Sequence, residues 1–370
     1  MKTIISLSLI VSVILLTVIS CGDDEQAIEI ITDKFDRQEM LIDWADLIII
    51  PAYEAYNSSL TTLVDKKNVF ITASTDDNLE SLRAAYIDAY KSWQRVSIFD
   101  IGKAEEIKLR NYTNIFPTDS EAINDNISSQ VYNLDLPSNY DAQGFPAIDY
   151  LLYGIADKDA DIKVALSKSK TLEYLSELIT KLHRQSDEVL SDWKSTYRAT
   201  FINNSGASAT ASVDKMVNDY IFYYEKFFRA GKVGIPAGVF SGSPIADAVE
   251  APYSNIYSKE LFFVAFNAVQ DFYAGRSFDG NTQGESLQSY LKYMQEQNNT
   301  TDISTKISDQ WTTAASAADL LSESFQDQVN TDNILMLNTY DQLQKTIILL
   351  KVDMLQALNI QVDFVDADGD

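Results

Sequence analysis

Apolar side chains recur every three or four positions in four segments of the chain, with polar residues between them. This spacing places the apolar side chains on one face of a helix, so the pattern predicts long amphipathic helices. Aromatic residues contribute to three of the four stripes, and we interpret them as core rather than as a cofactor site. The stripes are Leu82, Ala85, Tyr86, Ala89, Tyr90, Trp93 and Val96; Val217, Tyr220, Tyr224 and Phe228; Leu261, Ala265, Ala268 and Phe272; and Leu343, Ile347, Leu350, Met354 and Leu358.

Two stretches interrupt this periodicity, at residues 101–144 and 231–258, and both contain prolines. Each lies inside a run of helices, and long irregular insertions in compact helical proteins are often functional. A polar segment at residues 203–208 is a weaker break and marks a loop or linker. We therefore predict an all-α protein with two helical bundles, at residues 28–200 and 201–370.

Composition supports long helices and narrows the range of partners. The chain has 370 residues, of which 46% are hydrophobic, and only 13 are glycine and 7 proline. Few chain breakers favour helices over short strands with tight turns. The net charge of −25 makes nucleic acid and anionic membrane surfaces poor partners, because both carry negative charge.

The N-terminus predicts a lipid anchor. Residues 4–20 are apolar or small after a short basic start, and polar sequence follows at once, as in a signal peptide. Val18-Ile19-Ser20-Cys21 resembles a bacterial lipobox, and Cys21 is the only cysteine. We expect a signal peptide at residues 1–20. Residues 21–27 would then be a tether whose acyl chains include palmitate. The acidic cluster at residues 22–25 resembles a surface-export signal, so we expect the outer membrane, at its periplasmic face or at the cell surface.

Residues 144–154 carry a family resemblance, with the sequence Gly-Phe-Pro-Ala-Ile-Asp-Tyr-Leu-Leu-Tyr-Gly. This segment resembles the imelysin signature, in which a histidine follows a glycine by two positions and a glutamate follows the histidine by three. Here Pro146 stands at the histidine position and Asp149 at the glutamate position. Further blocks resemble the family in the expected order, from about Ile28 to the end of the chain, at residues 50–53, 93, 99–106, 115–119, 229–238 and 250–254.

The resemblance implies two related helical bundles, with the signature near their junction and facing a cleft. It also implies a role in iron uptake or in the cell envelope, and the founding description of the family is a metallopeptidase. A zinc hydrolase needs about three protein ligands and a general base. A proline side chain cannot bind a metal, so Pro146 argues against the metal site of the family.

Other residues offer little support for peptidase chemistry. His183 is the only histidine, and we interpret it as a surface residue paired with Asp187. Gly144 and Pro146 predict the start of a helix. Asp149 would then lie in the first turn, where its carboxylate accepts N–H bonds and opposes the helix dipole.

Carboxylates suggest two further sites, each with a simpler explanation. Glu105, Glu106, Asp149 and Glu250 could form a cluster that binds a hard cation, or they could pair with the cations Lys103, Arg110, Arg229 and Lys232. The C-terminal Asp366-Ala367-Asp368-Gly369-Asp370 resembles the start of a calcium loop, but the later glutamate of such loops is missing. A solvated acidic end is the simpler expectation.

We expect a non-catalytic envelope lipoprotein that holds a ligand in the cleft and is linked to iron uptake. Alternatives are a divergent metallopeptidase and a surface interaction protein with a vestigial site. Expected partners are the membrane, through Cys21, and iron-uptake or other envelope proteins. For the cofactor two possibilities stay open: no cofactor, or a metal ion such as iron or calcium. Asp149 and Glu250 would accept hydrogen bonds or bind a cation, and Arg229 and Lys232 would bind anions or neutralise the acids. The expected site residues are Gly144, Pro146, Asp149, Arg229, Lys232, Glu250 and Ser254.

Overall fold

The computed structural model describes residues 33–364, and residues 35–364 pack as a single unit. Helices make up most of these residues, and no strand occurs among them apart from an isolated bridge between Arg276 and Gln283. The prediction of an all-α fold is therefore confirmed. The boundary between two bundles at residues 200 and 201 stays a prediction.

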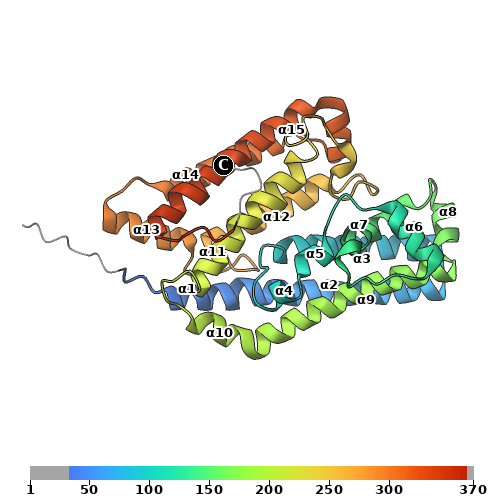
Figure 1. The fold of residues 1–370 in the computed structure, drawn as a ribbon, viewed down its shortest axis with the longest axis horizontal. Helices are drawn as coiled ribbons and strands as arrows, with labels where there is room; N and C mark the ends of the chain where they lie inside the picture. The colour runs from blue at the N-terminus through green and yellow to red at the C-terminus, as the bar shows by residue number, and fades with distance from the viewer. Residues whose placement is uncertain (1–32, 365–370) are drawn as a thin grey trace, which may run out of the picture. The chain divides into compact units, whose positions relative to one another are not determined.

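The first half of the described chain is built on three long helices. Helix α2 packs against both α3 and α9, and Figure 1 shows α2 and α9 running side by side. The Thr75 side chain caps α3 by accepting the N–H of Asn78. The elements are α1 (Arg37–Asp43), η1 (Trp44–Ile49), α2 (Ile50–Thr72), α3 (Asp76–Val96), α4 (Lys103–Glu106), α5 (Leu109–Thr113), α6 (Ser120–Ser129), η2 (Pro137–Ala142), α7 (Gly144–Asp149), η3 (Tyr150–Gly154), α8 (Asp159–Leu166), α9 (Ser169–Asp192), η4 (Trp193–Tyr197) and α10 (Arg198–Asn203).

The second half has a similar helical core that also touches the first. Helix α15 packs against α14 and η5, and α12 packs against α3. Figure 1 shows α14 and α15 in orange and red along one side of this half. The elements are α11 (Ser212–Phe222), η5 (Tyr223–Gly234), η6 (Ala246–Ala248), α12 (Ser258–Ala274), α13 (Leu287–Asn298), α14 (Ile303–Ala318), α15 (Phe325–Ile347), η7 (Ile348–Met354) and α16 (Leu355–Leu358).

The four apolar stripes lie where the spacing predicts, in α3, in α11 and η5, in α12, and in the run from α15 to α16. All their side chains are buried in one hydrophobic core, so the interpretation of the aromatic residues as core is confirmed. Two stripes nevertheless cross into π-helical segments, at η5 and η7. A π-turn holds an extra residue and is rare except as a local feature, often near functional sites.

The two interrupted stretches differ from each other. Residues 101–144 are less irregular than expected, because α4, α5, α6 and η2 form short helices between their turns. Residues 231–258 begin inside the π-helix η5 and then consist mainly of turns. The polar break at residues 203–208 is confirmed as the loop that follows α10.

No helix of the described part of the chain is both long and apolar enough to span a bilayer. The signal peptide, the lipidation at Cys21 and the tether stay predictions, because residues 1–32 lie outside the described residues, as does the acidic sequence from Asp366 to Asp370.

Candidate functional site

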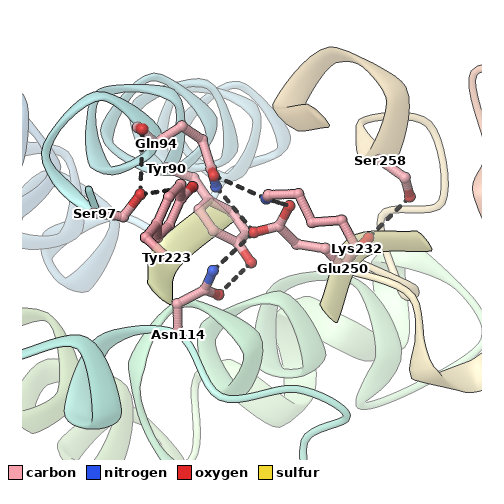
Figure 2. A network of polar contacts seen from close by, with 8 residues as sticks. All are labelled: Tyr90, Gln94, Ser97, Asn114, Tyr223, Lys232, Glu250 and Ser258. Atoms are coloured by element: carbon pink, nitrogen blue, oxygen red, sulfur yellow. Dashed lines mark hydrogen bonds and ion pairs between the residues drawn. The ribbon is translucent and has the colours of Figure 1, made fainter. Parts of the chain in front are cut away.

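A buried carboxylate, Glu250, is the centre of a polar network between α3, the end of α5, η5 and the turns before α12 (Figure 2). Its Oε1 accepts hydrogen bonds from Gln94 Nε2 at 2.9 Å and from Asn114 Nδ2 at 2.8 Å. Its Oε2 forms an ion pair with Lys232 Nζ, which also donates to Gln94 Oε1 at 2.8 Å. The charge of Glu250 is therefore compensated by one cation and solvated by two amides.

The network extends to the elements on either side. Tyr90 donates its hydroxyl proton to Asn114 Oδ1 at 2.6 Å, and Ser258 Oγ donates to the backbone carbonyl of Glu250 at 2.8 Å. Burial lowers the pKa of Lys232, and the nearby carboxylate of Glu250 opposes this shift. Because both charges are buried, loss of either partner would leave the other uncompensated, which typically destabilises a protein by about 3–5 kcal/mol.

A cavity of about 180 Å³ lies against this network. The α3 residues Trp93 and Gln94 line it together with Asn114 and the segment that follows Asn114. Residues of η5 complete the lining, including Phe227 and Lys232. Residues from both sides of the predicted boundary at 200 and 201 therefore contribute to one cavity.

The π-helical geometry of η5 shapes this cavity. The segment follows α11 without a break and contributes Tyr223, Lys226, Phe227, Gly231 and Lys232 to the lining. In an α-helix the first four of these positions would share one face and Lys232 would point away from it, whereas the wider π-turns bring Lys232 to the same side. In η5 the predicted apolar stripe that begins at Val217 passes from α-helical to π-helical backbone.

A second buried carboxylate, Asp149, lies at the end of α7. Its Oδ2 accepts the backbone N–H groups of Tyr253 at 2.9 Å and Ser254 at 3.3 Å, and Tyr86 donates to its Oδ1 at 3.3 Å. Burial raises the pKa of Asp149 to about 6, and these hydrogen bonds hold the shift in check. Asp149 thus ties α7 to the turns that carry Glu250.

The entry to α7 depends on the glycine at its first position. Gly144 has φ +72°, and a Cβ atom there would lie 2.2 Å from the carbonyl oxygen of Thr113. Pro146 follows inside the first turn, fully within the protein interior, so the predicted helix start is confirmed. Only glycine permits both this left-handed backbone and the close approach to α5.

The comparison with known proteins identifies the family. The sequence profile described as Imelysin matches residues 49–349, which is most of the chain. The chain belongs to the imelysin family. No functionally curated protein matches it.

Two solved structures share the fold of this imelysin. One is named an iron-regulated protein A precursor, from Parabacteroides distasonis; it is 16% identical, with a TM-score of 0.69, covering 85% of this chain and 94% of that chain. The other is an imelysin-like protein from Psychrobacter arcticum; it is 16% identical, with a TM-score of 0.68, covering 90% of this chain and 99% of that chain. At this identity the likeness establishes the helical fold alone.

The expected site residues of this imelysin fall into three groups. Lys232 and Glu250 form the network beside the cavity, and Asp149 and Ser254 meet at the end of α7. Arg229 belongs to a separate cluster, where it donates to Tyr340 Oη at 2.5 Å and to Gln344 Oε1. The expectation that Arg229 neutralises Asp149 or Glu250 is therefore wrong. Arg229 lies next to Glu225 instead, with 3.9 Å between guanidinium and carboxylate.

The proposed cluster of four carboxylates is not formed either. Glu106 pairs with Lys103 at 2.8 Å, and Glu105 lines a different cavity of about 260 Å³ beside Asp100 and Asp219. Within residues 33–364, no three His, Cys, Asp or Glu side chains are arranged to hold a metal ion. The alternative pairing of acids with lysines holds for Glu106 and for Glu250.

Two smaller expectations also change. His183 Nε2 lies 3.1 Å from Thr61 Oγ1 of α2, so its partner is that hydroxyl rather than Asp187. The expectation that Asp149 lies in the first turn is wrong, since it is the last residue of α7, and its carboxylate accepts N–H bonds from Tyr253 and Ser254 rather than from its own helix. Both errors have one cause, since a contact across the fold replaces the local contact that sequence spacing suggests.

The sequence patterns did not single out three polar residues of the site: Tyr90, Gln94 and Asn114. Tyr90 is a member of a predicted apolar stripe, and Gln94 follows Trp93 of the same stripe, so both were hidden by the core pattern. Asn114 lies in the first interrupted stretch, where Pro117 follows soon after. A sequence signal could have found Gln94, because it stands four positions after Tyr90 and so lies on the side of the helix that carries the apolar stripe.

Proposed function

We propose that this imelysin is a non-catalytic binding protein of the cell envelope, which holds a small ligand in the cavity beside the Lys232–Glu250 pair. The cavity of about 180 Å³, closed on one side by an internally satisfied polar network, is the observation that carries the proposal. Binding pockets are usually concave and mainly apolar, with a few placed polar groups. Of the residues expected from the sequence, Lys232 lines the cavity, Gly144 and Pro146 begin α7, and Asp149 at the end of α7 accepts the N–H of Ser254.

The state of the two carboxylates supports binding rather than hydrolysis. A general base must reach a substrate proton directly or through one water molecule. Both oxygens of Glu250 are engaged by the side chains of Gln94, Asn114 and Lys232. Asp149 is fully buried beneath two backbone N–H groups. Neither group is arranged as a base, and the proline at position 146 offers no metal ligand.

A link to iron uptake is part of the proposal and rests on weaker support. One protein of similar fold is named an iron-regulated protein A precursor. Regulation by iron would fit a protein that assists uptake without holding iron itself. Growth of a deletion strain under iron limitation, compared with iron-replete medium, tests this link. Equal growth of the deletion and parent strains under both conditions would contradict it.

A thermal-shift screen tests the binding function. The purified full-length chain, kept in detergent, is heated with a panel of carboxylates, phosphates, amino acids, sugars, Fe³⁺ and Ca²⁺. A ligand at 100 times its dissociation constant should add about 2.7 kcal/mol of stability. The variant Ile235→Trp places a large ring at the cavity lining, on a side chain that is 40% exposed, and should lose the shift.

A matched control separates the cavity from general effects of the substitution. Ile348→Trp adds the same ring at a position that is 52% exposed and outside the cavity lining, and it should keep the shift. A compound that stabilises both variants equally binds elsewhere and argues against the cavity. Stoichiometric zinc in the purified chain, together with casein cleavage that EDTA abolishes, would overturn the non-catalytic proposal.

The anchor is tested separately, through Cys21. Cells fed with labelled palmitate should incorporate label into the wild-type chain and not into Cys21→Ala. Protease treatment of intact cells then distinguishes the cell surface, where the chain is digested, from the periplasmic face, where it is protected. Label retained in Cys21→Ala would contradict lipidation at this cysteine.

A further inference from the structure

The lining of the cavity beside Lys232 differs in charge from the chain as a whole. The chain has 54 acidic and 29 basic residues. The cavity lining nevertheless includes three cationic side chains, Arg110, Lys226 and Lys232, and no acidic one among the described residues. This local reversal of charge is what a site for a negatively charged molecule requires.

Two of the three cations already have carboxylate partners. Lys232 is paired with Glu250. Arg110 donates to Asp219 through two nitrogens, at 3.0 and 3.1 Å, and it lies between this cavity and the second one. Its guanidinium also stacks over the Phe227 ring, 4.8 Å from the centroid. These two cations therefore shape the cavity without leaving a full positive charge in it.

Lys226 is different. It is half-buried on η5 and lines the cavity, and among residues 33–364 it has no hydrogen-bond or ion-pair partner. Its sequence neighbours at one π-helical turn, Ile221, Phe222, Ala230 and Gly231, include no acid. One positive charge in the cavity is thus uncompensated by the protein.

The remaining polar groups of the wall are used within the protein. The side-chain oxygen and nitrogen of Gln94 bond to Lys232 and Glu250, and those of Asn114 bond to Tyr90 and Glu250 (Figure 2). The hydroxyls of Ser97 and Tyr223, which also line the cavity, bond to each other at 3.0 Å. The rest of the lining is largely apolar and aromatic, including Trp93, Ile115, Phe116, Phe227 and Ile235. A ligand would therefore find apolar surface and a single cation.

Resting on the proposed binding function, we infer that the ligand is a small organic monoanion with an apolar body. Its anionic group pairs with Lys226, and its body packs against Trp93 and Phe227. Lys226 is then the residue that determines specificity for charge. A cavity of about 180 Å³ is below the usual range for drug-sized ligands, so the body is about the size of one ring.

Calorimetric titration with two matched probes tests the inference. Benzoate carries one negative charge on an aromatic ring, and benzamide has nearly the same shape without the charge. The full-length chain in detergent should bind benzoate at least tenfold more tightly than benzamide. Lys226→Gln should weaken benzoate binding at least tenfold and leave benzamide binding unchanged, whereas Lys226→Arg should stay within about threefold of the wild type.

Lys215→Gln is the matched control, because it removes the same charge from a lysine that lines the second cavity. It should leave benzoate binding unchanged. A loss of benzoate affinity equal to that of Lys226→Gln would show that only the overall electrostatic field of the protein matters, and would overturn the inference. Equal affinity for benzamide and benzoate, with no effect of Lys226→Gln, would overturn the anion while leaving the binding function intact. No binding of benzoate would overturn the inference, and the thermal-shift screen would then decide the binding function on its own.

Discussion

Two buried carboxylates, Glu250 and Asp149, have different sets of partners although both lie near Tyr90, whose pKa is raised first by burial and then by these two charges. Glu250 has a cationic partner, Lys232, together with two amide donors. Among residues 33–364, Asp149 forms no ion pair, and it accepts hydrogen bonds from the backbone N–H groups of Tyr253 and Ser254, from the Ser254 side chain and from the Tyr86 hydroxyl. The first arrangement compensates a charge, and the second only solvates it.

The two carboxylates have different structural roles: the partners of Glu250 belong to the wall of the cavity, whereas Asp149 holds a turn in place. The partners of Glu250 come from three distant parts of the sequence and form one side of the cavity. The partners of Asp149 come mainly from a single turn, which the carboxylate holds against α7. We therefore expect changes at Glu250 to alter both stability and ligand binding, and changes at Asp149 to act mainly on stability and its dependence on pH.

The largest effect is expected from removing the cation of the first site. Lys232→Met leaves the carboxylate of Glu250 buried without compensation, which should lower the free energy of unfolding by about 3–5 kcal/mol. Urea denaturation monitored by circular dichroism measures this. The double variant Lys232→Met with Glu250→Gln contains no buried charge and should recover most of the loss. A double variant as unstable as Lys232→Met would show that packing, not charge, explains the effect.

The second site should show a pH dependence instead. The pKa of Asp149 is raised to about 6 from the ordinary 3.8, so the folded state holds this proton more tightly than the unfolded state does. This contribution to stability is fully present below about pH 4 and is lost as the pH rises through about 6. Relative to Asp149→Asn, which cannot titrate, the wild type should lose about 2 kcal/mol between about pH 4 and about pH 7.

Comparison with the variant removes other titrating groups from this measurement. Burial also raises the pKa of Asp100 to about 6, but Asp100 is present in both proteins and its effect cancels. Urea denaturation at a series of pH values gives the difference. A difference between wild type and Asp149→Asn that stays constant over this range would contradict the assigned role of Asp149.

Two tyrosines allow a smaller, matched comparison. Tyr90→Phe removes a short hydrogen bond of 2.6 Å to Asn114, and should lower the free energy of unfolding by about 1–1.5 kcal/mol. Tyr86→Phe removes a hydroxyl whose single proton is shared between Asp149 Oδ1 and the Phe145 carbonyl, both at 3.3 Å, and should lower it by less than about 1 kcal/mol. Thermal unfolding of both variants tests the order. The reverse order would mean that Asp149 depends on its hydroxyl donor more than the geometry indicates.

The smallest effect on stability is expected at Lys226. Because this lysine has no ion-pair partner among the described residues, Lys226→Gln should change the free energy of unfolding by less than about 0.5 kcal/mol. Thermal unfolding without ligand measures this change. A loss above about 1 kcal/mol would indicate that Lys226 has a structural role, and would weaken its assignment to ligand binding.

Much of the fold could be predicted from periodicity, because amphipathic spacing decides which face of a helix is buried. The stripe on α3 and the start of α7 at Gly144 and Pro146 are examples. The π-helical segment η5 could not be predicted, since its apolar spacing fits an ordinary helix up to Phe228. Residues of this segment line the cavity, so the position of the cavity could not be predicted either.

The candidate site was predictable only in part, because its contacts join residues far apart in the sequence. Lys232 and Glu250 were singled out, but the partners Gln94 and Asn114 were not. Arg229 was placed with them on sequence proximity to Lys232, yet the structure directs it towards Tyr340. The nature of the side chains suggested a polar site, and only the fold shows which of them meet.

The central claim is that the cavity beside the Lys232–Glu250 pair holds the ligand. Crystals of the protein soaked in 4-bromobenzoate test it most directly, because bromine gives an anomalous signal that locates the ring. We predict one strong bromine peak in the cavity between Trp93 and Phe227, with the carboxylate at Lys226, and no such peak in Ile235→Trp. A bromine peak elsewhere with the cavity empty, or no peak at all, would contradict the account.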